Sequence, residues 1–282
     1  MGALPVKTAR LLRQMLTHAF LSLSAVLVLI PFYWMAGTSL KPSAEVERVP
    51  PTLFPGHFRW ANYIDAIRQA PLLTYLLNTI IVGIAVAAVG TIITVLSAYA
   101  FARMHFPGRQ TLFFTVLAMM MIPQEMLIIT NFRTIAEFGW MNTWQALIVP
   151  FWVNPFNIFL LRQTFMQIPD ELYWAAKVEG MGHFRYLTRV MLPLSRSTVA
   201  VTVIFTMIWI WQTYAWPNLV TTKDELRLVS NGLQNAFTNS VGTIEYELQM
   251  AAAMLVTLPL ILLFLLLRKP ILSGMIHGGI KG

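Results

Sequence analysis

The chain has 282 residues, of which 57% are hydrophobic and only 11% are charged. Soluble domains carry roughly 25% charged residues, so this composition excludes both a soluble globule and an intrinsically disordered chain. A disulfide-rich secreted scaffold is also excluded, because the sequence contains no cysteine. The class that remains is an integral membrane protein.

Five long stretches contain no charged residue and a sixth contains one, and a helix needs about 20 mostly apolar residues to cross a bilayer. These stretches cover 14–40, 69–102, 110–132 with Glu125 as its one charge, 138–161, 197–222 and 248–267. The sequence therefore predicts an all-α integral membrane protein with six transmembrane helices. Their expected cores are 16–37, 73–101, 111–131, 144–162, 198–217 and 248–267.

The positions of lysine and arginine predict the orientation of these helices. If both termini are cytoplasmic, 13 of the 20 basic residues fall in cytoplasmic segments and seven fall outside. The net charge of +8 therefore indicates topology, and no basic stretch is interleaved with aromatic residues as nucleic-acid binding would require. A secretory signal peptide is the competing interpretation of the N-terminus, but the first apolar run is longer than such a peptide needs.

This topology divides the chain into three parts. Residues 1–15 are expected to form a cytoplasmic N-terminus, 16–267 a six-helix transmembrane domain, and 268–282 a cytoplasmic tail. Two loops are long enough to have structure of their own. The outer loop 38–72 is proline-rich and is expected to cover the first pair of helices, while the cytoplasmic loop 163–197 carries a recognisable pattern.

Two short helices are expected within the cytoplasmic loop. Asp170 after Pro169 is a candidate N-cap, and the acidic residue that follows suits the positive end of a helix dipole. One face of the first helix carries Glu171, Trp174, Ala175 and Val178. Gly180 and Gly182 end it, and a basic helix then runs to Pro193. The pattern fits a helix–turn–helix that contacts a partner, and equally an amphipathic hairpin on the bilayer surface.

Polar side chains at membrane depth are candidates for a solute path, because they are costly there unless they face protein or a cavity. The candidates are Gln124, Glu125, Asn154, Asn157, Trp211, Gln212 and Tyr214. Amides beside aromatic rings suit a polyhydroxylated solute. Interhelical hydrogen bonds are the alternative for the polar residues, and Trp209 and Trp216 are expected to be interfacial anchors. Gly83, Ala87 and Gly90 form a small-residue face expected to pack against another helix.

Enzymatic sites are not indicated by the sequence. The five histidines show no metal-ligand spacing, and no Ser/His/Asp set is apparent. A phosphate-binding loop of the form Gly-x-x-x-x-Gly-Lys is also missing, since no Gly-Lys dipeptide occurs. We therefore expect no catalytic residues, no bound metal and no cofactor in this chain.

At the cytoplasmic loop, the sequence resembles the permease subunits of ATP-binding-cassette (ABC) importers, in the carbohydrate-uptake family related to the maltose permeases. That family's loop reads Glu-Ala-Ala, then a glycine, then a proline about a dozen residues later. Ala175, Ala176, Gly180 and Pro193 match it, whereas Trp174 replaces the glutamate and Glu179 replaces the usual aspartate. Further likeness covers most of the chain, at Ser39-Leu40-Lys41, Ala98–Arg103, Trp211–Pro217, Met250–Ala253 and Gly278–Gly282.

The resemblance implies a type I ABC importer permease in a prokaryotic inner membrane. Its implied partners are a second permease chain, two copies of an ATPase that holds ATP and magnesium, and an extracytoplasmic solute-binding protein. It also implies that the ATPase is contacted through Glu171, Trp174, Ala175, Ala176, Val178, Glu179, Gly180 and Pro193. The implied solute is a sugar, oligosaccharide, polyol or glycerol-phosphate-like molecule. The alternative function is an ion-coupled secondary transporter or channel that uses Glu125.

Overall fold

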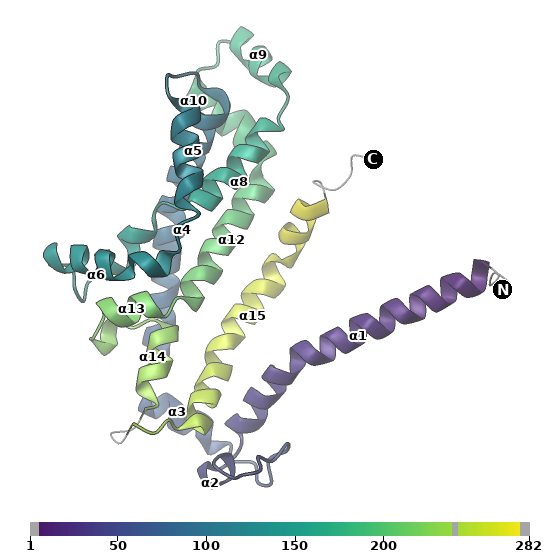
Figure 1. Ribbon diagram of the computed structural model, residues 1–282, viewed down its shortest axis with the longest axis vertical. Coiled ribbons are helices and arrows are strands. Elements are labelled where there is room, and N and C mark those ends of the chain that lie inside the picture. The colour runs from purple at the N-terminus through teal and green to yellow at the C-terminus, as the bar shows by residue number, and fades with distance from the viewer. Residues whose placement is uncertain (1–5, 239–241, 277–282) are drawn as a thin grey trace. The chain divides into compact units, whose positions relative to one another are not determined.

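The computed structural model describes residues 6–238 and 242–276, and it is helical throughout (Figure 1). Within these residues the only β-type pairing is an isolated bridge between Thr238 and Ile244. The α-helices are α1 (Val6–Ser39), α2 (Ser43–Val46), α3 (Ala61–Gln69), α4 (Leu72–Arg103), α5 (Arg109–Met119), α6 (Ile128–Glu137), α7 (Trp144–Ile148), α8 (Pro155–Met166), α9 (Asp170–Val178), α10 (His183–Tyr186), α11 (Leu192–Leu194), α12 (Arg196–Gln212), α13 (Ala215–Val220), α14 (Val229–Ala236) and α15 (Tyr246–Ile276). Short 3-10 helices are η1 (Gln124–Leu127), η2 (Val149–Phe151) and η4 (Asp224–Leu226), and η3 (Leu187–Met191) is a π-helix.

Three helical segments are long and apolar enough to cross a membrane: Arg13–Ser39, Leu72–Arg103 and Trp144–Met166. Two bent helix pairs raise the number to five if each pair is one span, and the described part of α15 includes a shorter apolar helix, Tyr246–Leu262. These segments overlap the six stretches expected from charge distribution, although only three of them are single helices of spanning length. The prediction of a helical membrane protein is therefore confirmed.

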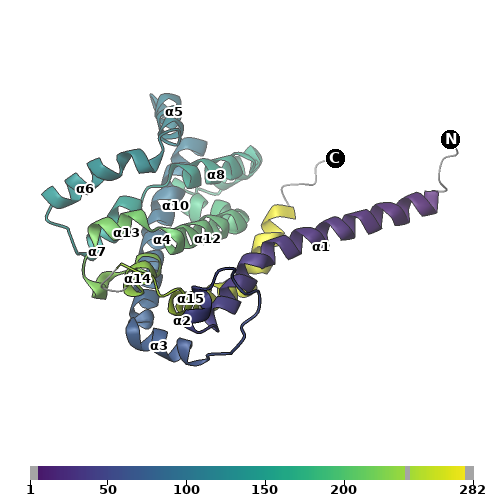
Figure 2. The same ribbon diagram turned by 60° about the horizontal axis from the view of Figure 1, so that its bottom comes forward.

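The expected third span is not one continuous helix. Helix α5 ends at Met119, and α6 starts at Ile128 after a bend of 88° that is visible in Figures 1 and 2. Pro123 lies in the break, where it has no backbone N–H to donate and its ring would clash with the carbonyl of residue 119 in a helix. Glu125 therefore lies in η1 at a corner, and not part-way along a straight helix.

The described residues divide into two compact units, one formed by 6–70, 233–238 and 242–258 and the other by 71–232 and 259–276. In the second unit α4 packs against both α8 and α12, as Figure 1 shows. Small residues permit close approach: a Cβ at Gly83 would lie 2.8 Å from the sulfur of Met207 in α12, and one at Gly90 would lie 3.1 Å from the carbonyl oxygen of Trp152, in the segment before α8. Ala87 is buried between them. The small-residue face of α4 is thus a packing surface, as expected.

In the first unit, the outer loop folds around the C-terminal end of α1. The buried Asn62 amide of α3 donates to the carbonyl oxygens of Ser39 (2.9 Å) and Lys41 (2.8 Å), and the Ser39 hydroxyl is 2.8 Å from that of Tyr63. The Lys41 ammonium donates to the Thr52 carbonyl at 2.5 Å. Ser39-Leu40-Lys41 therefore forms the anchor of the outer loop.

Glu45 also stabilises the outer loop, through hydrogen bonds to residues later in the loop. Its carboxylate accepts hydrogen bonds from the Thr52 hydroxyl (2.7 Å) and from the Gly56 backbone N–H (2.9 Å). The Thr52 bond, followed by the Gly56 bond, lowers the pKa of Glu45 below its ordinary value of 4.5. A carboxyl whose pKa is lower in the folded state stabilises that state above its unfolded pKa, and this contribution is lost as the pH falls through the folded pKa.

Glu45→Gln is therefore expected to weaken the outer loop at neutral pH and to remove the acid-dependent part of its stability. Amide hydrogen exchange over residues 52–58, corrected for the intrinsic rate, measures this at about pH 6 and about pH 3. The wild type should lose protection between these values, whereas the variant should be weakly protected at both. Equal protection of the two proteins at about pH 6 would contradict this role of Glu45.

The stretch after the expected fifth span contains structure that the sequence analysis did not predict. Within the second unit, the Asn78 amide of α4 donates to the carbonyl oxygens of Glu225 (2.7 Å) and Arg227 (2.9 Å). The Thr79 hydroxyl accepts from the Val229 backbone N–H at 2.9 Å, at the start of α14. Polar side chains near the N-terminal end of α4 thus fix this segment onto the helix.

Candidate functional site

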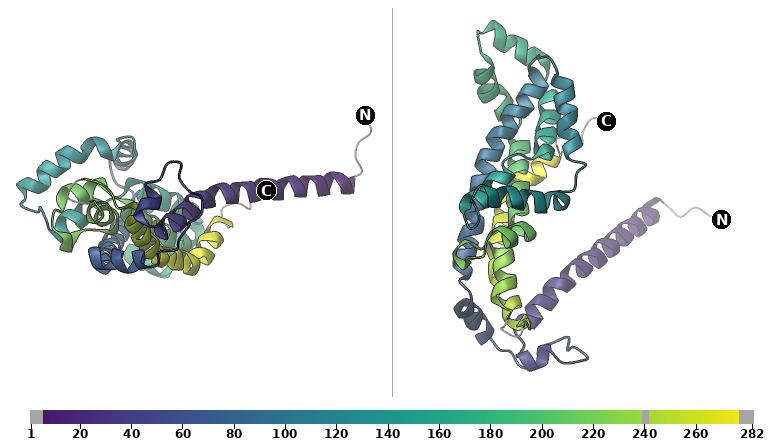
Figure 3. Two further views of the ribbon diagram at one scale, coloured as in Figure 1. Left: turned by 90° about the horizontal axis from the view of Figure 1, so that it is seen from below. Right: turned by 60° about the vertical axis from the view of Figure 1, so that its left-hand side comes forward.

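The loop at residues 163–197 folds into the expected helix–turn–helix, in which α9 is followed by the continuous helical run α10–η3–α11. We call residues 170–194 the coupling hairpin, after the role that the sequence predicts for them. It lies at one end of the second unit, at the top of Figure 1 and of the right-hand view in Figure 3. Asp170 was expected to be the N-cap of α9, which is wrong: Pro169 occupies that position, and the Asp170 carboxylate instead pairs with Arg103.

Gly180 ends α9 in a left-handed conformation, with φ of 74°. Its backbone N–H donates to the Lys177 carbonyl (3.0 Å), and the N–H of Met181 donates to the Ala176 carbonyl (2.9 Å). These are the two hydrogen bonds of a Schellman motif, which satisfies carbonyls that a helix end leaves without partners. A glycine is needed here because a Cβ is disfavoured at positive φ.

Helix α9 has one face packed on the chain and one face open. Ala176 is 5% exposed and lies in the core with partly buried Tyr173 packed beside it, whereas Trp174 is 64% exposed and Val178 is 90% exposed. Ala175 is also exposed. A tryptophan and a valine one turn apart, uncovered by the described residues, form an apolar surface that suits a protein partner. Of the other coupling candidates, Glu171, Glu179, Gly180 and Pro193 are all exposed.

The second leg of the hairpin packs into the same core. Tyr186, Leu187 and Met191 are buried together with residues of α4 and α8. Pro193 lies at the end of this leg, where the chain bends by 80° into α12. The hairpin is therefore attached to the helices α4, α8 and α12 through a shared apolar core.

Two polar residues of α4, neither of which the sequence analysis singled out as a candidate, also hold the hairpin. Arg103, the last residue of α4, contacts Asp170 of α9. The Tyr99 hydroxyl, one turn earlier, lies 2.7 Å from Nδ1 of His183 at the start of α10. The charge of Arg103 is visible in the sequence, but its partner lies 67 residues away, so no local pattern could have revealed the contact.

The two asparagines of the fourth span occupy different environments. They were expected on one helical face, but Asn154 lies before the helix in an extended conformation, where its side chain caps α8 by accepting from the Asn157 N–H at 3.1 Å. Asn157 is 5% exposed, and its amide donates to the Thr206 hydroxyl of α12 at 3.3 Å. Its Oδ1 is buried and has no hydrogen-bond partner among the described residues.

The remaining path candidates lie at helix junctions. Gln124 and Glu125 are exposed in η1. Gln212 ends α12 and is exposed, as is Tyr214 before α13, whereas Trp211 is half-buried. Trp216 was expected to be an interfacial anchor, which is wrong, because it is 6% exposed and its indole N–H donates to the Ala146 carbonyl at 2.8 Å.

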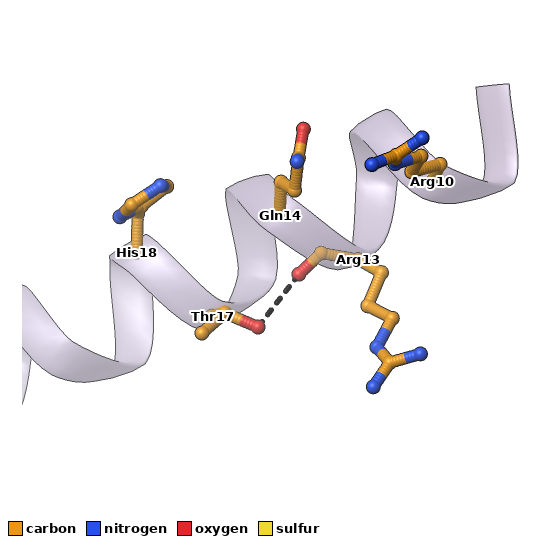
Figure 4. Close-up of a pocket in the computed structure, with 5 residues that line it drawn as sticks. All are labelled: Arg10, Arg13, Gln14, Thr17 and His18. Carbon is orange, nitrogen blue, oxygen red and sulfur yellow. Dashed lines mark hydrogen bonds between the residues drawn. The ribbon is translucent and has the colours of Figure 1, made fainter. Parts of the chain in front are cut away.

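A polar group near the N-terminal end of α1 surrounds a shallow hollow of about 260 Å³ (Figure 4). It is lined by Arg10, Arg13, Gln14, Thr17 and His18. The Thr17 hydroxyl donates to the carbonyl of Arg13 at 2.8 Å, one turn earlier. All of the lining residues come from one helix, so the hollow does not enclose a solute. Its charge fits the basic flank that the sequence predicts for a cytoplasmic end.

Comparisons with known proteins agree with this architecture. Residues 90–275 match the family described as "Binding-protein-dependent transport system inner membrane component". The chain is 30% identical over 267 residues to the sn-glycerol-3-phosphate transport system permease protein UgpE of Brucella abortus, an alignment that covers 92% of this chain and 95% of that protein. It is 29% identical over 265 residues to the diacetylchitobiose uptake system permease protein NgcG of Streptomyces coelicolor, covering 93% and 87% of the two chains.

A similar fold occurs in a chain of a bacterial ABC transporter involved in the import of the acidic polysaccharide alginate. The two structures align with a TM-score of 0.80 at 20% sequence identity, over 95% of this chain and 99% of that one. The fold is that of a type I ABC importer permease. From the family match and the relatives together, the chain belongs to the family of inner membrane components of binding-protein-dependent transport systems.

Proposed function

We propose that this chain is one of two different permease subunits that together form the translocation path of an ATP-driven importer. The solute is a sugar, oligosaccharide, polyol or glycerol-phosphate-like molecule, delivered by an extracytoplasmic binding protein. Two copies of a separate ATPase supply the energy, and this chain hydrolyses no ATP itself. Both termini lie on the cytoplasmic side of a prokaryotic inner membrane. The match of residues 90–275 to the family is the observation that carries this proposal.

The solute class rests on the relatives and on the chemistry of the path candidates. One relative is named for diacetylchitobiose and another for sn-glycerol-3-phosphate, which are both small and rich in hydroxyl groups. The candidates Asn154, Asn157 and Gln212 offer amide donors and acceptors, and Tyr214 adds an exposed aromatic ring. None of the seven path candidates is a cation. This set favours an uncharged polyhydroxylated solute over a phosphate, which would need a counter-ion from another part of the path.

Coupling to the ATPase is assigned to the coupling hairpin, because its exposed Trp174 and Val178 offer an apolar contact next to the small Ala175. ATP binding closes the ATPase dimer and moves the two hairpins, and the permease pair then changes from inward-facing to outward-facing. Such a shift requires that the ATP-bound dimer contacts one permease state more favourably than the other. The hairpin is where this difference in contact arises.

The assembly is tested by purifying the tagged full-length chain from its native membrane. A second permease and an ATPase are expected to co-purify with it. Because the sequence has no cysteine, a single cysteine placed at Val178 gives an unambiguous cross-linking site. That site is expected to cross-link to the ATPase, whereas one at the exposed Leu73, in the first turn of α4, is not. Purification of the chain alone, with no cross-link from residue 178, would contradict the proposal.

The Asn157 amide provides a test of the solute path. Asn157→Ala is expected to raise the solute concentration at half-maximal uptake by roughly two- to tenfold, the effect of losing one hydrogen bond. Thr206→Val is the matched control, because it removes the hydrogen bond between α8 and α12 but leaves the amide in place. Gln212→Ala, at an exposed position, is expected to act in the same direction as Asn157→Ala. If Asn157→Ala and Thr206→Val have equal effects and Gln212→Ala has none, these amides do not contact solute.

A further inference from the structure

Arg103 makes an unusual set of contacts for a residue at the end of a membrane helix. Its side chain is only 9% exposed, although the Asp170 carboxylate that it pairs with is 74% exposed. The same guanidinium donates to two backbone carbonyls, those of Phe165 (3.1 Å) and Ile168. A cation that only marked the membrane boundary would extend into water. Arg103 instead points inward to three acceptors.

These acceptors belong to two other helix ends. Helix α8 ends at Met166, so the Phe165 carbonyl is among the last four, which have no partner within a helix. A cation at a helix C-terminus satisfies such carbonyls and is favoured by the helix dipole. Asp170 is the first residue of α9, and Ile168 lies in the connection between the two helices. One planar guanidinium therefore joins the ends of α4 and α8 to the start of α9.

A second contact fastens the other leg of the coupling hairpin to the same helix. Tyr99 is 4% exposed, and its hydroxyl is hydrogen-bonded to His183 at the start of α10. Ala176 and Tyr186, one from each leg, are buried in the same apolar cluster as Tyr99. Both legs of the hairpin are thus attached to the last two turns of α4. The connection 167–169 between α8 and α9 is bridged by the Arg103 contacts.

We propose that Arg103 is a positioning residue that makes the coupling hairpin and the end of α4 move as one body. A push on the open face of α9 is then transmitted to α4, a central packing helix of the second unit, and is not absorbed by bending at residues 167–169. This inference rests on the proposed function of the hairpin, since it concerns how a displacement of α9 reaches the helices of the permease. In this proposal, Arg103 transmits the displacement of α9 to α4 through its contacts with Asp170, Phe165 and Ile168.

The attachment is tested on the full-length chain in lipid nanodiscs. Cysteines for spin labels are introduced at Leu96, 49% exposed on α4, and at Val178, 90% exposed on α9. Arg103→Gln is expected to broaden the distance distribution between the labels, and Asp170→Asn to broaden it less, because the two carbonyl contacts remain. Arg109→Gln is the matched control, since Arg109 lies near the same end of α4, but among the described residues its guanidinium donates only to the Met104 carbonyl. Unchanged distributions for Arg103→Gln would overturn the proposal.

The transmission is tested in the complex with its co-purified partners, by measuring solute uptake per ATP hydrolysed. Arg103→Gln is expected to lower this ratio roughly fivefold or more, the lower range of coupling between sites, while the ATPase remains bound and active. Asp170→Asn, a change at an exposed carboxylate that keeps the fold, is expected to give a smaller fall, and Arg109→Gln none. An unchanged ratio for Arg103→Gln would overturn the positioning role even if the labels showed a looser hairpin.

The two experiments separate this inference from the proposed function. If the hairpin did not dock an ATPase, the wild-type chain would fail to retain one, whatever residue occupied position 103. The spin-label distances are measured on the chain alone and do not depend on docking. A wild-type complex that couples uptake to ATP, together with an Arg103→Gln complex that couples equally well, would leave the proposed function intact and remove Arg103 from it.

Discussion

Ala175→Arg is expected to abolish ATP-driven uptake while leaving the chain folded and inserted. Ala175 is exposed on α9, between the exposed Trp174 and the buried Ala176. Because the side chain of alanine is a single methyl group, a partner protein can approach α9 closely at this position. A long cation at this position holds the partner away and places an unpaired charge in the contact, which costs several kcal/mol if it is buried. Uptake and ATPase retention by the reconstituted complex measure the effect.

The control is a cation added elsewhere in the second unit. Thr111→Arg places the same side chain at an exposed position in the first turn of α5 and is expected to leave uptake unchanged. Ala176→Arg differs again, because residue 176 is buried and the substitution should destabilise the hairpin itself. Full ATP-driven uptake by Ala175→Arg would contradict the assignment of α9 as the coupling surface.

Gly232→Ala is expected to destabilise the protein, although alanine is the better helix former. In α14 a Cβ at residue 232 would lie 2.4 Å from a ring carbon of Tyr75, a side chain that is itself only 1% exposed. The helix propensity gained is about 1 kcal/mol, whereas overpacking of a filled core costs about 1–3 kcal/mol. The clash should therefore outweigh the propensity. A lower midpoint of thermal unfolding of the purified complex would show it.

Two further variants identify the clash as the cause. Gly182→Ala changes a glycine that has no heavy atom within 4 Å of a built Cβ and whose φ is −73°, so its midpoint should stay close to that of the wild type. In the double variant Gly232→Ala/Tyr75→Leu, the two effects should not add, because the smaller side chain makes room for the new methyl group. A Gly232→Ala protein as stable as the wild type would mean that α14 does not pack on Tyr75.

The membrane class and most of the helices could be predicted from the sequence, because both depend on where charges are absent. Stretches of more than 20 residues without a charge allow few other structures in lipid. The bend in the third span was missed because hydropathy counts apolar residues regardless of backbone geometry. Pro123 was visible, but a proline within a membrane helix either kinks or ends it, and only tertiary contacts decide between these outcomes.

The fold of residues 213–236 was missed for a different reason. The charged residues between Lys223 and Arg227 show no pattern that predicts a folded segment, yet Asn78 and Thr79 of α4 hold it through backbone atoms. Hydrogen bonds to a backbone leave no pattern in the sequence of the segment that is held. The same limit applied to Asn154, whose capping role depends on where α8 begins.

Of the candidate site, sequence alone predicted the two helices of the coupling hairpin and the glycine between them. Helical periodicity predicted the face that carries Trp174 and Val178, and both side chains are exposed in the structure. The attachment of the hairpin could not be predicted, because Arg103 and Asp170 are distant in sequence. Each is also the kind of charged residue that commonly lies at the end of a membrane helix or at the start of a surface helix. Pairing between distant charges depends on the packing of α4 against α8, which no local pattern specifies.

We expect this chain to move solute only as part of an ATP-driven complex. The most direct measurement is solute uptake by proteoliposomes that contain either the co-purified complex or the chain alone, with ATP and ion gradients supplied separately. Uptake is expected from the complex only, dependent on ATP and on the solute-binding protein, and the chain alone is expected to take up no solute under any ion gradient. Uptake by the chain alone, driven by an ion gradient and abolished by Glu125→Gln, would contradict it and establish an ion-coupled transporter.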